Sequence, residues 1–203
     1  MKFPFDKKRI IDGMSFQTYY NLTDQLVAEG KTTGPKQTED LAHYTKLNLS
    51  RMKRLAKTAS LNDALIEKIN QVKRKTYFLV ISEAWCGDAA QNVPLIAKAT
   101  EFSSNIEIKI ILRDENLDIM DAFLTNGGRS IPKVIAIDAE SLEVIGKWGP
   151  RPQAAQKLML ELKAKNAPYA EISERLQRWY IEDKTNSFQA DFLELIESTI
   201  KGS

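Results

Sequence analysis

The single cysteine of the chain, Cys86, lies between a stretch typical of a buried strand and a stretch typical of a helix. At such a junction the free amide hydrogens and the positive end of the helix dipole stabilise a thiolate. They can lower a cysteine pKa from its usual ~8.5 and make the sulfur a nucleophile near neutral pH. A lone cysteine elsewhere in a fold more often packs as an inert apolar side chain. Its position makes Cys86 the first candidate for a catalytic residue.

Charged residues near Cys86 decide how acidic its thiol can be. Asp88 lies two residues further on, and at ~6 Å its repulsion of a thiolate is worth about 0.7–2.8 kcal/mol, against about 0.3–2 kcal/mol from the helix dipole. These contributions nearly cancel, which predicts a thiol that is only mildly acidified unless a cation intervenes. Arg129 is the nearest candidate, and we expect it to pair with Asp88 or Cys86. The alternative is that Asp88 is only a carboxylate at the start of the helix and that Arg129 is a solvated loop residue.

The elements that would position these residues follow from hydrophobic periodicity. A continuous apolar run, as in a strand buried on both faces, is followed by alternating helical and strand patterns and then by two strands that suit a hairpin. This order predicts an α/β fold with a mixed central sheet and helices on both faces. The expected strands are 77–81, 106–112, 133–137 and 143–148, and the expected helices are 89–102 (with Pro94 inside it), 116–124 and 152–165, the last closing the unit.

Helical patterns flank this central unit. Before it, we expect helices at 16–27, from the capping residue Thr38 onward, and from Ser60 to about Lys75; after it, two more reach the carboxyl end. The predicted organisation is an amino-terminal helical extension (1–75), a central domain (76–165) and carboxyl-terminal helices (166–203). The terminal helices either cap the sheet or form a homodimer or docking surface around residues 179–192.

Four landmarks in this order resemble the thioredoxin superfamily: Trp85-Cys86-Gly87 after a buried strand, Pro94 in the next helix, Ile131-Pro132 before the hairpin, and Gly149 after it. The resemblance covers about residues 77–165. It implies a thioredoxin-like fold in which the Ile131–Pro132 bond is cis and faces Cys86. A cis proline there leaves the Ile131 amide and carbonyl free to pair with an extended peptide. The substrate groove would include Trp85, Gly87, Asp88, Arg129, Ile131 and Pro132, with Trp148 either beside it or in the core.

Two departures from the family pattern limit the chemistry. The second redox cysteine of the family corresponds to Ala89, so the motif is a one-cysteine variant and no internal disulfide can form. The buried acid of the family corresponds to Val80, which leaves no proton acceptor beneath the sulfur. A mixed disulfide on Cys86 would therefore need an external thiol to resolve it.

Two functions remain open at this point. The first is a monothiol thiol–disulfide oxidoreductase, in which Cys86 attacks a disulfide of a protein or small molecule and a thiol such as glutathione resolves the adduct. The second is a redox-inactive module with a thioredoxin fold that binds peptides or proteins. Neither requires a bound cofactor.

Composition excludes other classes of function. One cysteine and one histidine, His43, argue against a disulfide framework, a Cys/His zinc site and Ser/His/Asp catalysis. A net charge of +2 without long runs of like charge argues against a nucleic-acid partner. The sequence contains neither a signal-peptide pattern nor an apolar stretch long enough for a membrane span, so we expect a cytoplasmic protein.

Overall fold

A four-stranded mixed sheet forms the centre of the computed structural model, which describes residues 1–201. The strand order is β2-β1-β3-β4. β1 (Thr76–Ser82) pairs in parallel with β2 (Ile106–Leu112) and antiparallel with β3 (Lys133–Asp138). β4 (Val144–Trp148) lies at the edge, antiparallel to β3. The predicted α/β fold with a mixed sheet is confirmed, and β2 has the predicted bounds.

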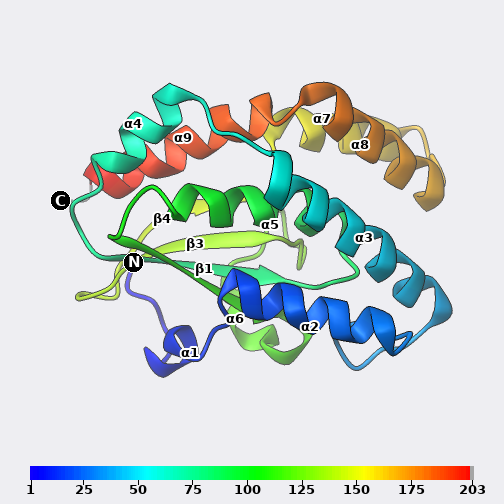
Figure 1. Cartoon of the computed structure of the whole chain (residues 1–203), viewed down its shortest axis with the longest axis horizontal. Helices are drawn as coiled ribbons and strands as arrows, with labels where there is room; N and C mark the ends of the chain where they lie inside the picture. The colour runs from blue at the N-terminus through cyan, green and yellow to red at the C-terminus, as the bar shows by residue number, and fades with distance from the viewer. Residues whose placement is uncertain (202–203) are drawn as a thin grey trace.

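Helices cover both faces of the sheet, as predicted (Figure 1). α5 and α9 lie over one face and α6 lies at the other. β1 is buried between these layers, which explains why its sequence is a continuous apolar run rather than an alternating one. The helices are α1 (Lys8–Ile11), α2 (Phe16–Ala28), α3 (Glu39–Thr58), α4 (Asp63–Asn70), α5 (Gly87–Thr100), α6 (Leu117–Ala122), α7 (Gln153–Ala164), α8 (Tyr169–Asp183) and α9 (Asn186–Lys201), and a single 3-10 turn, η1 (Arg113–Glu115), follows β2.

The helix that closes the sheet is α9, whereas the sequence pattern assigned this place to the helix after Pro152. The ring of Phe192 on α9 packs edge-on against Phe78 of β1, with centroids 5.8 Å apart. Trp148 of β4 packs against Phe188 of the same helix at 5.3 Å. Two aromatic side chains of α9, Phe188 and Phe192, thus join the carboxyl-terminal helix to aromatic side chains of β4 and β1. Trp148 is a core residue, which decides between the two roles considered for it.

The amino-terminal helices begin where side-chain caps allow. Thr38 caps α3 as predicted, because its hydroxyl accepts a hydrogen bond from the Leu41 amide at 3.2 Å. The expected cap at Ser60 is wrong. Asn62 caps α4 through the Leu65 amide at 2.9 Å, and the helix ends at Asn70. This side-chain cap two residues further along starts the helix at Asp63, and its buried residues are Leu65 and Ile69.

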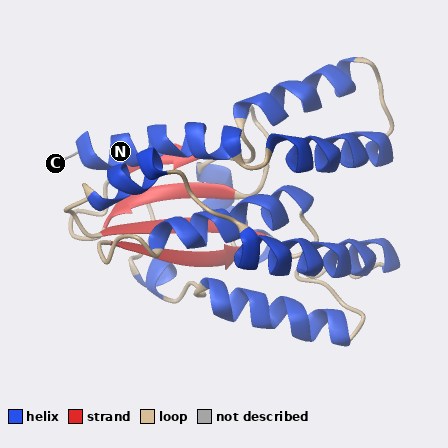
Figure 2. Cartoon of the chain, turned by 45° about the horizontal axis from the view of Figure 1, so that its top comes forward, coloured by secondary structure: helices blue, strands red, loops and turns tan. Residues whose placement is uncertain are grey.

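α7 and α8 form a hairpin that extends away from the sheet (Figure 2). Its apolar side chains form a cluster of their own, separate from the main core. The buried members of this cluster are Ala155, Met159, Leu162, Ile172 and Leu176. No helix within residues 1–201 is both long enough and apolar enough to cross a lipid bilayer.

Candidate functional site

Cys86 caps the amino terminus of α5 and faces the loop before β3. Its backbone is extended (φ −81°, ψ 116°), which turns the chain from the end of β1 into the helix. The Ile131–Pro132 peptide bond is cis, as the sequence predicts. The Cys86 thiol donates a hydrogen bond to the Ile131 carbonyl oxygen at 3.3 Å. The sulfur and the proline loop are therefore in direct contact, and this carbonyl is occupied rather than free.

Burial controls the acidity of this thiol. Only 8% of Cys86 is exposed, and burial, followed by the charge of Asp88, raises the pKa of its thiol from 9.0 to about 12. The backbone amides of Ala89 and Asp88 and the charge of Arg151 act in the opposite direction, but they are weaker. The expectation of a mildly acidified thiol is wrong for this arrangement. That expectation compared the effect of the Asp88 charge on the thiol pKa with the effect of the helix dipole. Desolvation of the thiol, which the sequence does not reveal, has a larger effect on this pKa than either.

The cation that pairs with Asp88 is Arg151, from the turn between β4 and α7. Its Nε donates to Asp88 Oδ2 at 3.0 Å, and its Nη2 makes a still closer contact with the same oxygen. Burial lowers the pKa of the guanidinium, but the adjacent Asp88 raises it by more. The Tyr180 hydroxyl on α8 donates to Asp88 Oδ1 at 2.8 Å. The carboxylate of Asp88 thus binds two segments that follow the sheet in sequence, the turn after β4 and the helix α8.

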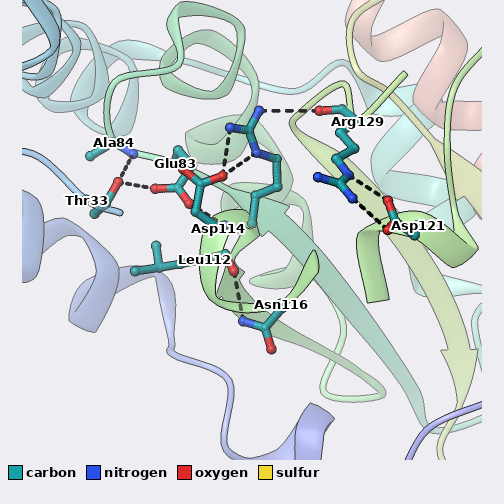
Figure 3. A network of polar contacts seen from close by, with 9 residues as sticks. Thr33, Glu83, Ala84, Leu112, Asp114, Asn116, Asp121 and Arg129 are labelled. Carbon is teal, nitrogen blue, oxygen red and sulfur yellow. Dashed lines mark hydrogen bonds and ion pairs between the residues drawn. The ribbon is translucent and has the colours of Figure 1, made fainter. Parts of the chain in front are cut away.

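Arg129 does not pair with Asp88 or Cys86, contrary to the expectation. It forms a bidentate ion pair with Asp121, with Nε–Oδ1 and Nη2–Oδ2 distances of 2.6 and 2.8 Å (Figure 3). Its backbone carbonyl accepts a hydrogen bond from Arg113 at 3.4 Å. The Arg113 guanidinium also lies 4.7 Å from the centre of the Trp85 ring, a cation–π contact. Arg113, which sequence reasoning missed, therefore connects Trp85 to the loop before Pro132.

A buried acid is present near the motif, although not at the position of Val80. Glu83 is fully buried, and burial raises the pKa of its carboxyl group. It accepts hydrogen bonds from the Thr33 hydroxyl and, at 2.9 Å, from the Asp114 amide (Figure 3). These partners fix the loop before α3 and the turn after β2. Both carboxylate oxygens of Glu83 are occupied by these contacts, so we assign it a structural role.

A cavity of about 270 Å³ opens beside Cys86. Trp85, Gly87, Asp88, Arg129 and Ile131, all expected at the substrate site, contribute to its wall together with Cys86. The opposite wall comes from α7 and α8, and the sequence did not predict this cover. Gln177 of α8 lies so close that a Cβ on Gly87 would be 3.0 Å from its Nε2. The residues of the cover are Met159, Lys163, Tyr169, Ile172, Ser173, Leu176 and Gln177.

Replacing Asp88 with Asn is expected to lower the pKa of Cys86 by about one unit, the size of a single charge contact in partly buried surroundings. The change removes a charge that raises this pKa and leaves the opposing charge of Arg151 unneutralised. The ultraviolet absorbance of the thiolate against pH measures the effect. Asp118→Asn, which breaks an exposed ion pair with Arg9, is the matched control. An Asp88→Asn variant with the pKa of the wild type would refute the assigned electrostatics.

His43, the one histidine of the chain, does not line this cavity. His43 is exposed, and its nearest ring contact is with Tyr44 at 6.1 Å. Within the described part of the chain, no group of three or more His, Cys, Asp or Glu side chains could hold a metal ion. Cys86 is the thiol at this cavity, and the polar backbone of Ile131 lies beside it.

Comparison with known proteins gives one family match and two similar structures. A family model described as thioredoxin matches residues 34–181, well over half of the chain. A crystal structure of an HIV epitope scaffold is similar at a TM-score of 0.58 and 22% identity, covering 95% of this chain and 98% of that one. A protein of unknown function from Pseudomonas aeruginosa is similar at a TM-score of 0.49 and 22% identity, covering 88% and 99%. No curated protein matches.

Proposed function

The chain belongs to the thioredoxin family, and from this premise we propose that it catalyses thiol–disulfide exchange with Cys86 as its nucleophile. The Cys86 thiolate attacks one sulfur of a disulfide, forming a mixed disulfide and releasing the other sulfur as a thiolate. An external thiol of the glutathione type then attacks the mixed disulfide, regenerates the Cys86 thiolate and leaves as a new disulfide. The external thiol supplies the electrons in each cycle. Such a thiol is abundant in a reducing compartment, so we propose the cytoplasm as the location.

The position of the Cys86 sulfur carries this proposal. The sulfur lies at the start of α5, where the amides of Asp88 and Ala89 stabilise its negative charge, and it touches the Ile131 carbonyl oxygen. An incoming disulfide that enters the 270 Å³ cavity meets this sulfur beside the peptide backbone of Ile131. The Ile131 amide donates no hydrogen bond to a described residue, so it can pair with the backbone of a substrate.

Ala89 determines how the reaction ends. A dithiol protein releases its substrate when a second cysteine attacks the first sulfur, but Ala89 has no thiol and is only 1% exposed. The mixed disulfide therefore persists until a thiol from solution reaches it. We expect a long-lived adduct and a turnover rate that rises with the concentration of the external thiol.

The cover formed by α8 must move for this reaction to occur. Because burial raises the pKa of the Cys86 thiol to about 12, the thiol is protonated near neutral pH in the closed arrangement. Three polar contacts hold α8 to α5, one of them the hydrogen bond that Asn92 Nδ2 donates to the Tyr180 hydroxyl at 3.0 Å. Gln91 Nε2 donates to Gln177 Oε1 at 2.8 Å, and Tyr180 donates to Asp88 at 2.8 Å. Because the apolar cluster of α7 and α8 is separate from the main core, the hairpin can move without opening that core.

Combining Tyr180→Phe with Gln177→Ala is expected to accelerate iodoacetamide alkylation of Cys86 by about ten-fold. Gln177→Ala removes one polar contact of the cover and Tyr180→Phe removes two, and a net hydrogen bond is worth about 0.5–1.5 kcal/mol. The alkylation rate at fixed pH, followed by mass spectrometry, measures exposure of the thiol. Tyr77→Phe, at the start of β1 and so at the opposite end of that strand from Cys86, is the matched control. An unchanged rate in the double variant would show that α8 does not limit access to Cys86.

A second candidate function rests on the raised pKa of Cys86. A thiol that stays protonated and donates to a backbone carbonyl can be a structural part of a peptide-binding groove. In that case the wild-type chain and a Cys86→Ser variant would bind a reduced, extended polypeptide equally well, and neither would form a covalent adduct with a disulfide. Adduct formation by the wild type alone favours the oxidoreductase.

A further inference from the structure

Arg113 lines the cavity beside Cys86 and belongs to η1, the turn that follows β2. Its guanidinium contacts three groups at once. Nε and Nη2 reach Asp114 Oδ1 at 2.8 and 2.7 Å, Nη1 donates to the Arg129 carbonyl oxygen at 3.4 Å, and the guanidinium carbon lies 4.7 Å from the centre of the Trp85 ring. These contacts hold other residues of the cavity wall and not the sulfur. The exchange reaction proposed above does not use this side chain.

A buried carboxylate fixes the turn that carries Arg113. The Asp114 amide donates to Glu83 Oε1 at 2.9 Å, and the other oxygen of this carboxylate accepts from the Thr33 hydroxyl (Figure 3). Glu83 is fully buried, and it lies two residues before Trp85 in the chain. Buried polar contacts of this kind are stronger than exposed ones, because the local dielectric is low. One carboxylate thus holds both the turn that carries Arg113 and the segment that carries Trp85.

The Trp85 ring has few other constraints on its orientation. The backbone before it is fixed, because the Ala84 amide donates to the Thr33 hydroxyl and the Ala84 carbonyl accepts from Asn48 Nδ2, both at 2.9 Å. The ring is half-buried against the main core and, within the described residues, stacks on no other aromatic ring. A guanidinium over the face of an indole favours one orientation of the ring. Arg113 therefore orients Trp85.

The same guanidinium holds the loop that the thiol contacts. The Arg129 carbonyl that accepts from Arg113 lies two residues before Ile131. The Ile131 carbonyl accepts from the Cys86 thiol at 3.3 Å, and the Ile131 amide can pair with the backbone of a substrate. The Arg129 guanidinium is bound to Asp121 and does not take over this contact. Arg113 therefore joins the ring that precedes the thiol to the backbone that the thiol contacts.

We propose that Arg113 is a positioning residue, which holds Trp85 and the Ile131 loop at the spacing that an extended polypeptide disulfide needs to reach Cys86. This role rests on the proposed exchange at Cys86 and adds a substrate class to it, disulfides carried by a polypeptide. A small thiol reagent reaches the sulfur without pairing with the loop or packing on the ring, so its reaction does not depend on their spacing. A polypeptide makes both contacts at once, and misplacement of either lowers its rate.

The test compares two reactions of the full chain. In the first, the Cys86 thiolate attacks the cysteine sulfur of a neutral, extended peptide that carries a pyridyl disulfide, so that a disulfide between the peptide and Cys86 forms and pyridine-2-thiolate leaves. In the second, methyl methanethiosulfonate transfers its methylthio group to Cys86 and releases methanesulfinate. Arg113→Ala is expected to slow the first reaction by about ten-fold and to leave the second unchanged, because only the peptide uses the ring and the loop.

Two further variants separate positioning from charge. Arg113→Lys keeps the positive charge but loses the planar group that makes several contacts at once, so we expect it to react with the peptide as slowly as Arg113→Ala. Arg9→Ala is the matched control. Arg9 also binds a carboxylate with two N–H groups, that of Asp118, and lies 5.9 Å from an aromatic ring, that of Phe5, but it does not line the cavity. Both of its rates should equal those of the wild type.

Three results would overturn this role of Arg113. They are an Arg113→Ala variant that reacts with the peptide as fast as the wild type, equal changes in the two rates, which would place the effect on the thiol or on the fold, and an Arg113→Lys variant with the rate of the wild type, which would leave only charge. A wild type that forms no peptide adduct would refute the exchange reaction itself, and the role of Arg113 with it.

Discussion

Replacing Ala89 with Cys is expected to give the chain a disulfide reductase activity at least about 10²-fold above that of the wild type. Ala89 lies in the first turn of α5, and its amide points at the Cys86 sulfur. A thiol at this position can attack a mixed disulfide on Cys86 within the same molecule, which replaces a slow bimolecular step with an intramolecular one. Turnover of an insulin-type disulfide substrate with a dithiol reductant measures the gain.

A second buried alanine of the same helix provides the control. Ala97 is 7% exposed and lies far along α5, so Ala97→Cys introduces a thiol that cannot reach Cys86. Its activity should equal that of the wild type. If Ala89→Cys forms the internal disulfide, as seen by mass spectrometry, but gains no reductase activity, the groove does not present substrates to Cys86 and the binding function is favoured.

Replacing Gly149 with Ala is expected to destabilise the protein by about 3 kcal/mol or more. Gly149 has φ of +102°, which L-residues avoid, and a Cβ there would overlap the carbonyl oxygen of Pro132. The clash involves backbone atoms, so it can be relieved only by moving the loop that faces Cys86. The free energy of unfolding in urea measures the loss.

Gly127→Ala separates the two causes of this effect. Gly127 also has a positive φ, of 75°, but a Cβ there would meet no atom within 4 Å. Its substitution should cost only the backbone penalty, about 1–2 kcal/mol. Equal losses in the two variants would mean that the contact between Gly149 and Pro132 does not hold this loop in place.

The strands and their succession along the chain could be predicted because their signals are local. The continuous apolar run of β1 shows burial on both faces, β2 alternates at its start, and the sequence around Ile131–Pro132 marks the loop that faces the thiol. The cap at Asn62 was missed because Ser60 offers the same chemistry two residues earlier. Only the packing of Asn62 against Gln189, whose side chain accepts from its amide at 2.6 Å, distinguishes the two.

The electrostatics of the site could not be predicted because they depend on tertiary contacts. Arg129 is near Pro132 in sequence, but its guanidinium forms an ion pair with Asp121 across the same loop. Arg151 reaches Asp88 over 63 positions of the sequence, and Tyr180 reaches it over 92. The burial of Cys86 also depends on tertiary contacts. The chain reverses direction between α7 and α8, and this reversal places α8 over the cavity beside Cys86. A periodic pattern of apolar residues shows which face of a helix is buried. It does not show which residues that face packs against.

The most direct test of the central claim is whether Cys86 exchanges with a disulfide in the native protein. The folded chain is incubated with glutathione disulfide near neutral pH, and its intact mass is followed over time, with Cys86→Ser as the control. We expect one glutathione adduct on the wild type, none on Cys86→Ser, and removal of the adduct by reduced glutathione. If the native wild type forms no adduct while the unfolded chain forms one readily, Cys86 is not a working nucleophile and the proposed reaction is wrong.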